Sequence, residues 1–243
     1  MSTLLLRLAG AMQSWGTQSR FTERDSGREP SKSGVVGLLC AAEGRSRGEV
    51  VDDLAQLRLG VRVDAEGTVQ LDYQTAGGGT FRGAQYGVAT VGGKARRTAL
   101  SHRYYLADAD FLVGLEGQDD GLLRRLHAAL REPHWQLCLG RKAFVPGAPV
   151  WLPDGVKTGM PLLDVLRLEP WPRDGLPLPP AWRRPPQLRF VVEDREGAEV
   201  CRDQPYGAAF LDRTFAPRYV RTVFKDLGAE IPIREDVLCT SPV

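Results

Sequence analysis

The sequence predicts an α+β fold in which one ferredoxin-like or RRM-like domain follows the order β-α-β-β-α-β. Three observations predict it. A short apolar strand near the start leads through a polar loop into a helix with a clear beginning and end. Two stretches of alternating apolar and polar residues follow, and further on comes a helix that is apolar along one side. A protruding glycine-rich basic β-hairpin and a small β-rich C-terminal extension complete the prediction.

The first strand and the first helix are the clearest elements. Strand Leu4–Leu8 is apolar except for Arg7, and a polar loop joins it to a helix over Ser31–Glu43. Proline and serine suit the first turn of a helix, because proline has a suitable φ and serine offers a side-chain acceptor. Gly44 stands where this helix should end. One face of the helix is apolar and should enter the core: Val35, Leu38, Leu39 and Ala42.

The elements after this helix are predicted from the spacing of their apolar residues. Glu49–Leu57 has the spacing of a second, short helix. Gly60–Asp64 and Thr68–Tyr73 alternate on either side of Ala65-Glu66-Gly67, which predicts a β-hairpin. The plan then needs two more strands, an amphipathic helix that stops before Pro133, and a closing strand: Arg103–Leu106, Phe111–Leu115, Asp119–Arg131 and Trp135–Leu139.

Composition divides the chain into three parts. Residues 1–146 should form the ferredoxin-like domain, and residues 147–186 a proline-rich connecting segment whose tryptophans pack back on the body. Residues 187–243 should form the β-rich extension, with strands at Gln187–Val192, Glu199–Cys201 and Tyr219–Phe224.

Overall composition excludes several classes of protein. With 42% hydrophobic and 26% charged residues over 243 positions, the chain reads as a soluble globular protein that can bury a proper core. The net charge of +2 does not exclude nucleic acid, because a local basic patch is enough to bind it. The four cysteines are scattered without metal-ligand spacing, which predicts reduced thiols in a cytoplasmic protein without a metal or other cofactor. No run is long enough for a signal or membrane segment.

The start of the first helix is a candidate phosphate site. The N–H groups of a first helical turn favour anions, and Lys32 and Ser33 stand beside them. Arg20 and Arg28 in the preceding loop add positive charge. A nucleotide-binding P-loop is disfavoured, because serines replace both of its glycines. The same segment also fits an ordinary capped core helix, and both interpretations can hold together.

Two basic stretches contain no acid. From Tyr73 to Ala107 the chain has no Asp or Glu but seven glycines and several cations, which favours an extruded hairpin near residues 74–105 that meets a polyanion. An ordinary solvated loop is the alternative. The run 213–225 is also free of acids, and its alternation lets Arg218 and a threonine share one face toward a ligand. A solvated sheet face explains that second run nearly as well.

Short motifs over the first 145 residues resemble those of one family and occur in the family's order. They are MQSWG at 12–16, SRF at 19–21, PSKSGVVGLL at 30–39, Asp72-Tyr73-Gln74-Thr75, Arg103–Ala109 running into Phe111-Leu112-Val113, and Leu139-Gly140-Arg141-Lys142. In these motifs the chain resembles the CasD family, the crRNA 5′-handle-binding subunits of type I-E CRISPR Cascade within the fifth Cas family. Beyond Pro146 the resemblance narrows to the stretch around Asp212-Arg213 and Arg218-Tyr219.

The resemblance implies a repeat-associated (RAMP superfamily) fold and a non-catalytic subunit that binds the 5′ handle of a crRNA. Its protein neighbours would be the CasC backbone and the large subunit CasA, with target DNA met only indirectly and no contact with a membrane. The basic hairpin would be a thumb that presses on the RNA where handle meets spacer. The residues expected to bind RNA are Gln13, Ser14, Trp15, Arg20, Arg28, Ser31, Lys32, Ser33, Tyr73, Arg96, Arg97, Arg103, Arg141, Lys142 and Arg218.

Two other functions compete with this interpretation. A metal-independent endoribonuclease that processes precursor crRNA needs a general base and a general acid, and His102 with Tyr104 is the serious candidate pair. His127 and His134 fit structural or surface roles better. A purely protein-bridging subunit is the third possibility. Paired carboxylates and the H-E-x-x-H and G-x-S-x-G motifs are absent from the sequence.

Overall fold

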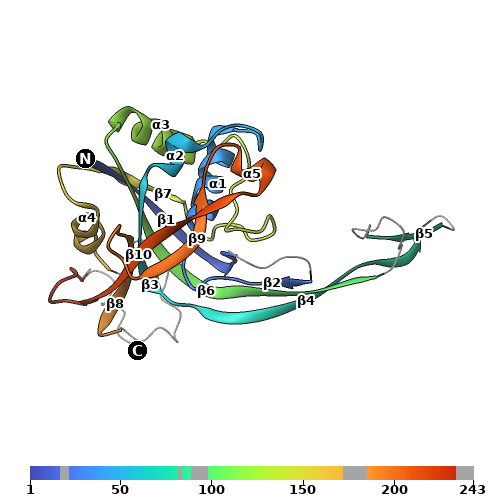
Figure 1. Ribbon diagram of the computed structural model, residues 1–243. Helices are drawn as coiled ribbons and strands as arrows, with labels where there is room; N and C mark the ends of the chain where they lie inside the picture. The colour runs from blue at the N-terminus through green and yellow to red at the C-terminus, as the bar shows by residue number, and fades with distance from the viewer. Residues whose placement is uncertain (17–21, 82–83, 89–97, 172–184, 234–243) are drawn as a thin grey trace.

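A four-stranded antiparallel sheet forms the centre of the computed structural model, which describes residues 1–16, 22–81, 84–88, 98–171 and 185–233 (Figure 1). The strand order across the sheet is β7-β1-β6-β3. These strands are β7 (Trp151–Thr158), β1 (Ser2–Gln13), β6 (Ala99–Gly117) and β3 (Arg58–Ala65). The molecule is thus a mixed α/β structure built on a large antiparallel sheet.

Helices cover both faces of this sheet, which explains the continuous apolar run in β1. Leu4, Leu6 and Leu8 enter one core with α1 (Lys32–Glu43) and α3 (Asp120–Arg131). Leu5 enters a second core, on the other face, with α4 (Leu162–Leu168). A strand buried on both sides needs apolar residues at consecutive positions, not at alternate ones. Arg7, the charged residue in this strand, is buried in an ion pair of 2.6 Å with Asp110 of β6.

The hairpin predicted around Ala65-Glu66-Gly67 is wrong. β3 and β4 (Thr68–Phe81) follow one another along the same side of β6, both antiparallel to it, so that Val63 faces Phe111 and Thr68 faces Ala107. Together they form one long strand with an irregularity, not two paired strands. The partner strand carries the matching irregularity at Asp108, a non-glycine residue with φ of 56°.

The true hairpin partner of β4 is β6, whose 19 residues join the two strands predicted at Arg103–Leu106 and Phe111–Leu115. Beyond the body, β4, β6 and the short β5 (Ala84–Gly87) extend as a narrow ribbon, which we call the arm (Figure 1). Gly77 and Gly78 have φ of 77° and 85° in the arm, which side chains rarely allow. Arg96 and Arg97 lie outside the described residues.

The C-terminal strands continue the central sheet. β8 (Gln187–Glu193) pairs with β3, and β10 (Phe215–Asp226) lies between β8 and β9 (Glu199–Pro205). The three predicted strands are confirmed here, each longer than predicted. Because β7 and β8 pair with β1 and β3, the sheet runs across the boundaries expected at residues 146 and 186. Trp171 is buried and donates to the Asp64 carbonyl at 3.2 Å, as expected for a tryptophan packed on the body.

Two smaller predictions need correction. Trp135–Leu139 is not a strand, because its start bonds to the end of α1: the amides of His134 and Trp135 donate to the carbonyls of Ala42 and Ala41. β7 provides the closing strand instead. The short helix predicted over Glu49–Leu57 is one turn, α2 (Asp52–Ala55). The remaining elements are β2 (Glu23–Arg24) and α5 (Ala209–Asp212), and none of the described helices is long and apolar enough to span a membrane.

The backbone at Asp108 leads to a prediction about stability. A β-branched side chain is strained at positive φ, so Asp108→Val should lower the free energy of unfolding by about 1–2 kcal/mol. Asp108→Gly should stay within about 1 kcal/mol of wild type. Urea unfolding measures both, with Thr75→Val, an exposed position of β4 without positive φ, as the control. Equal stability of Asp108→Val and wild type would contradict the prediction.

Candidate nucleic-acid interface

The predicted start of α1 is confirmed, but two of its N–H groups, those of Lys32 and Gly34, already donate to side chains of this chain. Ser31 is the N-cap, and its hydroxyl accepts from the Gly34 amide at 3.3 Å. The amide of Lys32 donates to a carboxylate oxygen of Asp203, on β9, at 2.7 Å. An acid at a helix N-terminus is favourable for the same reason that a phosphate is, namely the dipole and the unpaired donors of the first turn.

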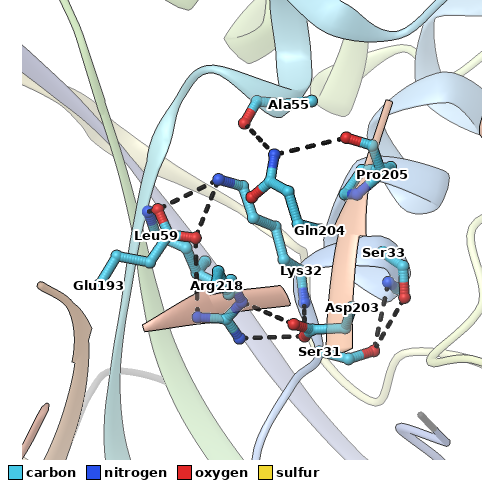
Figure 2. A network of polar contacts seen from close by, with 11 residues as sticks. Ser31, Lys32, Ser33, Ala55, Leu59, Glu193, Asp203, Gln204, Pro205 and Arg218 are labelled. Carbon is cyan, nitrogen blue, oxygen red and sulfur yellow. Dashed lines mark hydrogen bonds and ion pairs between the residues drawn. The ribbon is translucent and has the colours of Figure 1, made fainter. Parts of the chain in front are cut away.

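Four charged side chains form a buried network at this point, which we call the buried ion network (Figure 2). The Lys32 ammonium lies 2.8 Å from Glu193, and Arg218 lies 2.6 Å from Asp203 and 3.6 Å from Glu193. Glu193 also accepts from the Leu59 amide at 3.0 Å. Burial lowers the pKa of Lys32, and the attraction of Glu193 opposes that shift. Two positive and two negative groups therefore compensate each other inside the protein.

The buried ion network includes two of the predicted RNA contacts, Lys32 and Arg218. Lys32, Ser31 and Arg218 were expected to face a ligand, but all three are buried, and the two cations are held by carboxylates of the C-terminal strands. Ser33 is half-buried next to the Ser31 hydroxyl. The place expected for a phosphate is filled by Asp203 and Glu193, so this helix N-terminus is not an open anion site in the structure.

The motif at 12–16 also points inward. The Gln13 amide donates to the carbonyls of Leu8 and Ala109 at 3.0 and 2.7 Å and accepts from the Trp15 indole at 3.2 Å. Trp15 is buried so closely against Gly34 that a Cβ there would lie 2.8 Å from the ring. Ser14 is buried as well. In this structure Gln13, Ser14 and Trp15 are buried and hold the end of β1 against α1.

Three arginines from distant parts of the chain come together at the base of the arm. β2 pairs with β6 so that Arg24 lies beside Arg103. Arg141 approaches from the loop after α3 and donates to the Tyr104 carbonyl at 2.7 Å. We call Arg24, Arg103 and Arg141 the arginine cluster. Arg24 was not among the predicted contacts, because a two-residue strand that pairs with a segment 79 residues later leaves no local sequence signal.

Burial and neighbouring positive charge act together on Arg141 in the arginine cluster. Burial lowers the pKa of Arg141, and the positive charges of Arg103 and Arg24 lower it further, while Asp72 acts in the opposite direction. The guanidinium lies over the Phe144 ring at 5.4 Å. Its Nη1 atom is buried without a hydrogen-bond partner in the described part of the chain. An anion placed here would relieve the mutual repulsion of the cations.

Several other predicted residues are exposed in the structure. Tyr73, Tyr104 and Lys142 are exposed, as is Arg28 in the loop before α1. The Tyr73 ring lies 5.4 Å from that of His102, whose Nδ1 is 3.1 Å from a Glu23 carboxylate oxygen. Arg20 lies outside the described residues, as Arg96 and Arg97 do. The described residues contain no group of three or more His, Cys, Asp or Glu that could hold a metal ion.

Mutation of the buried Lys32 and mutation of the exposed Lys142 should have different consequences. Lys32→Met leaves a buried carboxylate without its partner, so it should lower the free energy of unfolding by about 3–5 kcal/mol. It should leave the RNA affinity of the folded protein unchanged. Lys142→Met, at an exposed position, should keep the stability and weaken RNA binding. Denaturant unfolding and RNA titration measure the two effects. A stable Lys32→Met protein that binds RNA poorly would contradict this prediction and would indicate that Lys32 contacts a phosphate of the RNA.

Comparison with known proteins agrees with the motifs and the fold. The family described as CRISPR-associated protein (Cas5) matches residues 3–221. The Cascade subunit CasD of Escherichia coli (strain K12) is 32% identical over 170 residues, which cover 62% of this chain and 70% of that protein.

Two solved structures are similar over nearly their whole length. A Cas protein crystal structure is 42% identical, with a TM-score of 0.72 and coverage of 95% of this chain and 97% of that one. A chain of a CRISPR RNA-guided surveillance complex is 33% identical, with a TM-score of 0.73 and coverage of 94% and 92%. This chain therefore belongs to the Cas5 family of CRISPR-associated proteins, with CasD-type subunits of Cascade among its relatives.

Proposed function

We propose that this protein is a non-catalytic crRNA-binding subunit of a type I-E Cascade complex, in which it caps the 5′ handle of the crRNA and bridges the CasC backbone and the large subunit CasA. The observation that carries the proposal is the arginine cluster, where Arg103 and Arg24 lie close enough to the half-buried Arg141 for their positive charges to lower its pKa. The similarity to a Cascade subunit and to a chain of an RNA-guided surveillance complex supports the same assignment.

The arginine cluster suits a phosphodiester backbone better than a single small anion. Guanidinium groups bind phosphate oxygens in pairs of parallel hydrogen bonds, and several of them side by side match several successive phosphates.

The strand order and the arm are consistent with the ferredoxin-like domain and thumb expected from the family resemblance. The order β7-β1-β6-β3, with α1 after β1 and α3 after β6, is the order that a ferredoxin-like domain would have. The arm projects from β4 and β6, next to the arginine cluster, where a thumb would reach a bound RNA (Figure 1). We infer that the arm acts as this thumb at the boundary of handle and spacer.

One observation favours the competing endoribonuclease. A histidine oriented by a carboxylate is a common general base, and His102 with Glu23 has this arrangement. The same segment has a structural explanation, however. The His102 amide donates to the Thr22 carbonyl, so both contacts of His102 hold the short β2 against β6. We therefore assign the pair to positioning Arg24 and propose that the protein does not cut RNA.

The salt dependence of RNA binding tests the arginine cluster. Removing one phosphate contact on a single strand should reduce the slope of log affinity against log salt by about 0.7. We expect this change, with weaker binding, for Arg103→Gln and for Arg141→Gln. Arg124→Gln, an exposed position on α3, is the control and should bind like wild type. Unchanged slopes in both cluster variants would remove the basis of the proposed function.

Incubation with labelled repeat RNA separates the scaffold from the nuclease. We expect binding without cleavage for wild type, and the same RNA length for His102→Ala. Tyr104→Phe, which keeps the ring, should bind like wild type. Specific cleavage by wild type that falls by about 10²–10⁴-fold in His102→Ala would establish the nuclease instead.

A further inference from the structure

The outer edge of β4 is long and unprotected. Within the described part of the chain, Thr68–Ala76 of β4 pair with β6, and β5 pairs only with the stretch from Gly77 onward, so no strand pairs with the other side of Thr68–Ala76. Every second residue from Thr68 to Ala76 therefore directs its N–H and C=O groups away from the sheet. Such an edge is a ready template for another strand, and proteins usually block it with charges, prolines or bulges.

The other edges of the same sheet carry these protective features. β7 contains Pro153, Asp154 and Lys157, and its pairing with β1 is interrupted by a register shift. β9 contains Glu199, Arg202, Asp203 and Pro205. In its 14 residues β4 has one charged side chain, Asp72, and no proline. The contrast within one sheet indicates that the edge of β4 is left available.

Apolar side chains next to this edge form an exposed stripe on one face of the arm. Val69, Leu71 and Tyr73 alternate along β4 and are 45%, 50% and 57% exposed. Tyr104 and Leu100 of β6 lie opposite Leu71 and Thr75, so their side chains share this face. A two-stranded ribbon is marginally stable on its own, because it buries little apolar surface. A partner that covers the stripe would supply the missing burial.

The cations occupy the opposite face of the arm. Arg103 lies opposite Asp72 on β4 and beside Arg24 on β2, whereas Leu71 and Tyr104 are their immediate neighbours in sequence and so point the other way. The face with the apolar stripe carries the Glu23 and His102 pair as its ionisable groups in the described residues. An RNA backbone fits the cationic face and has little to bind on the apolar one.

We propose that a β-strand of a neighbouring protein subunit pairs with the edge of β4 between Thr68 and Ala76 and lays its own apolar residues, at alternate positions, over Val69, Leu71 and Tyr73. The arm is then two-sided: RNA lies on the arginine cluster, and protein lies on the opposite face and edge. The open backbone groups specify an extended polypeptide, and the apolar stripe specifies alternate apolar residues in it. The inference rests on the proposed function in taking the partner to be another subunit of the same complex.

Hydrogen exchange resolved by residue tests the edge. The samples are the chain alone, the chain with repeat RNA, and the chain assembled with the other Cascade subunits of its source organism. We expect alternate amides from Thr68 to Ala76 to exchange at least about tenfold more slowly in the assembled complex than in the chain alone, and RNA alone to leave them unchanged.

A matched pair of double variants tests whether the apolar stripe contacts a partner subunit. Leu71→Ser with Tyr73→Ser should weaken incorporation into the complex by about tenfold or more, because buried aromatic and apolar anchors dominate such interfaces. Gln70→Ser with Gln74→Ser changes the opposite face of the same strand and should leave incorporation unchanged. Both variants should melt like wild type, since the altered side chains are exposed. RNA affinity should change less than about twofold in the Leu71 and Tyr73 variant, which separates this test from that of the arginine cluster.

Three outcomes would overturn the proposal. Protection of β4 by RNA alone would make RNA the occupant of the edge. Protection that grows with the concentration of the isolated chain, together with a dimer in sedimentation, would make a second copy the occupant. Unchanged exchange of these amides on assembly would show that the edge is not used.

Discussion

The structure depends on one strand, β6, that is shared by the body and the arm. Along its 19 residues β6 pairs with β1 on one side and with β3 and then β4 on the other, and at its outer half with β2. The helix-bearing sheet and the projecting arm are therefore not separate units joined by a flexible linker. The backbone irregularity at Asp108 marks the place where β6 passes from β3 to β4. It lets one continuous strand serve a buried sheet and an exposed ribbon.

The buried ion network joins the first helix to the end of the chain. Asp203 and Glu193 come from strands far along the sequence, yet they meet the first turn of α1 and the two cations there. Burying four charges is tolerable because each is paired and hydrogen-bonded, whereas any one alone would be costly. The same pairing orders β9 and β10 against α1. The network therefore contributes to the assembly of the fold.

Charge and apolarity are separated on the arm in the way that a subunit of a ribonucleoprotein complex requires. Alternation along β4 and β6 places Arg103 on one face and Tyr104 on the other, one residue apart. A single ribbon can then contact a polyanion and a protein without placing charges in the apolar contact. Arg141 arrives from a separate loop, so the cationic face is built by three distant segments and depends on the body being folded.

The sequence by itself determined the elements whose signals are local. The proline, serine and glycine that bound α1, the apolar face of α3 and the alternation in the C-terminal strands all act over a few residues, and these elements were predicted correctly. The family motifs likewise identified the relatives. Tertiary structure decided which strands pair and which cations are exposed. The alternating segments on either side of Gly67 fit a hairpin and a continuous strand equally well, and only β6 selects between them. From the local sequence, Lys32 is predicted to bind phosphate, because its partner Glu193 lies 161 residues away in the chain. Arg24 lies beside Arg103 only because β2 pairs with β6. Strand pairing and burial depend on residues that are distant in the chain, so they cannot be predicted from the local sequence.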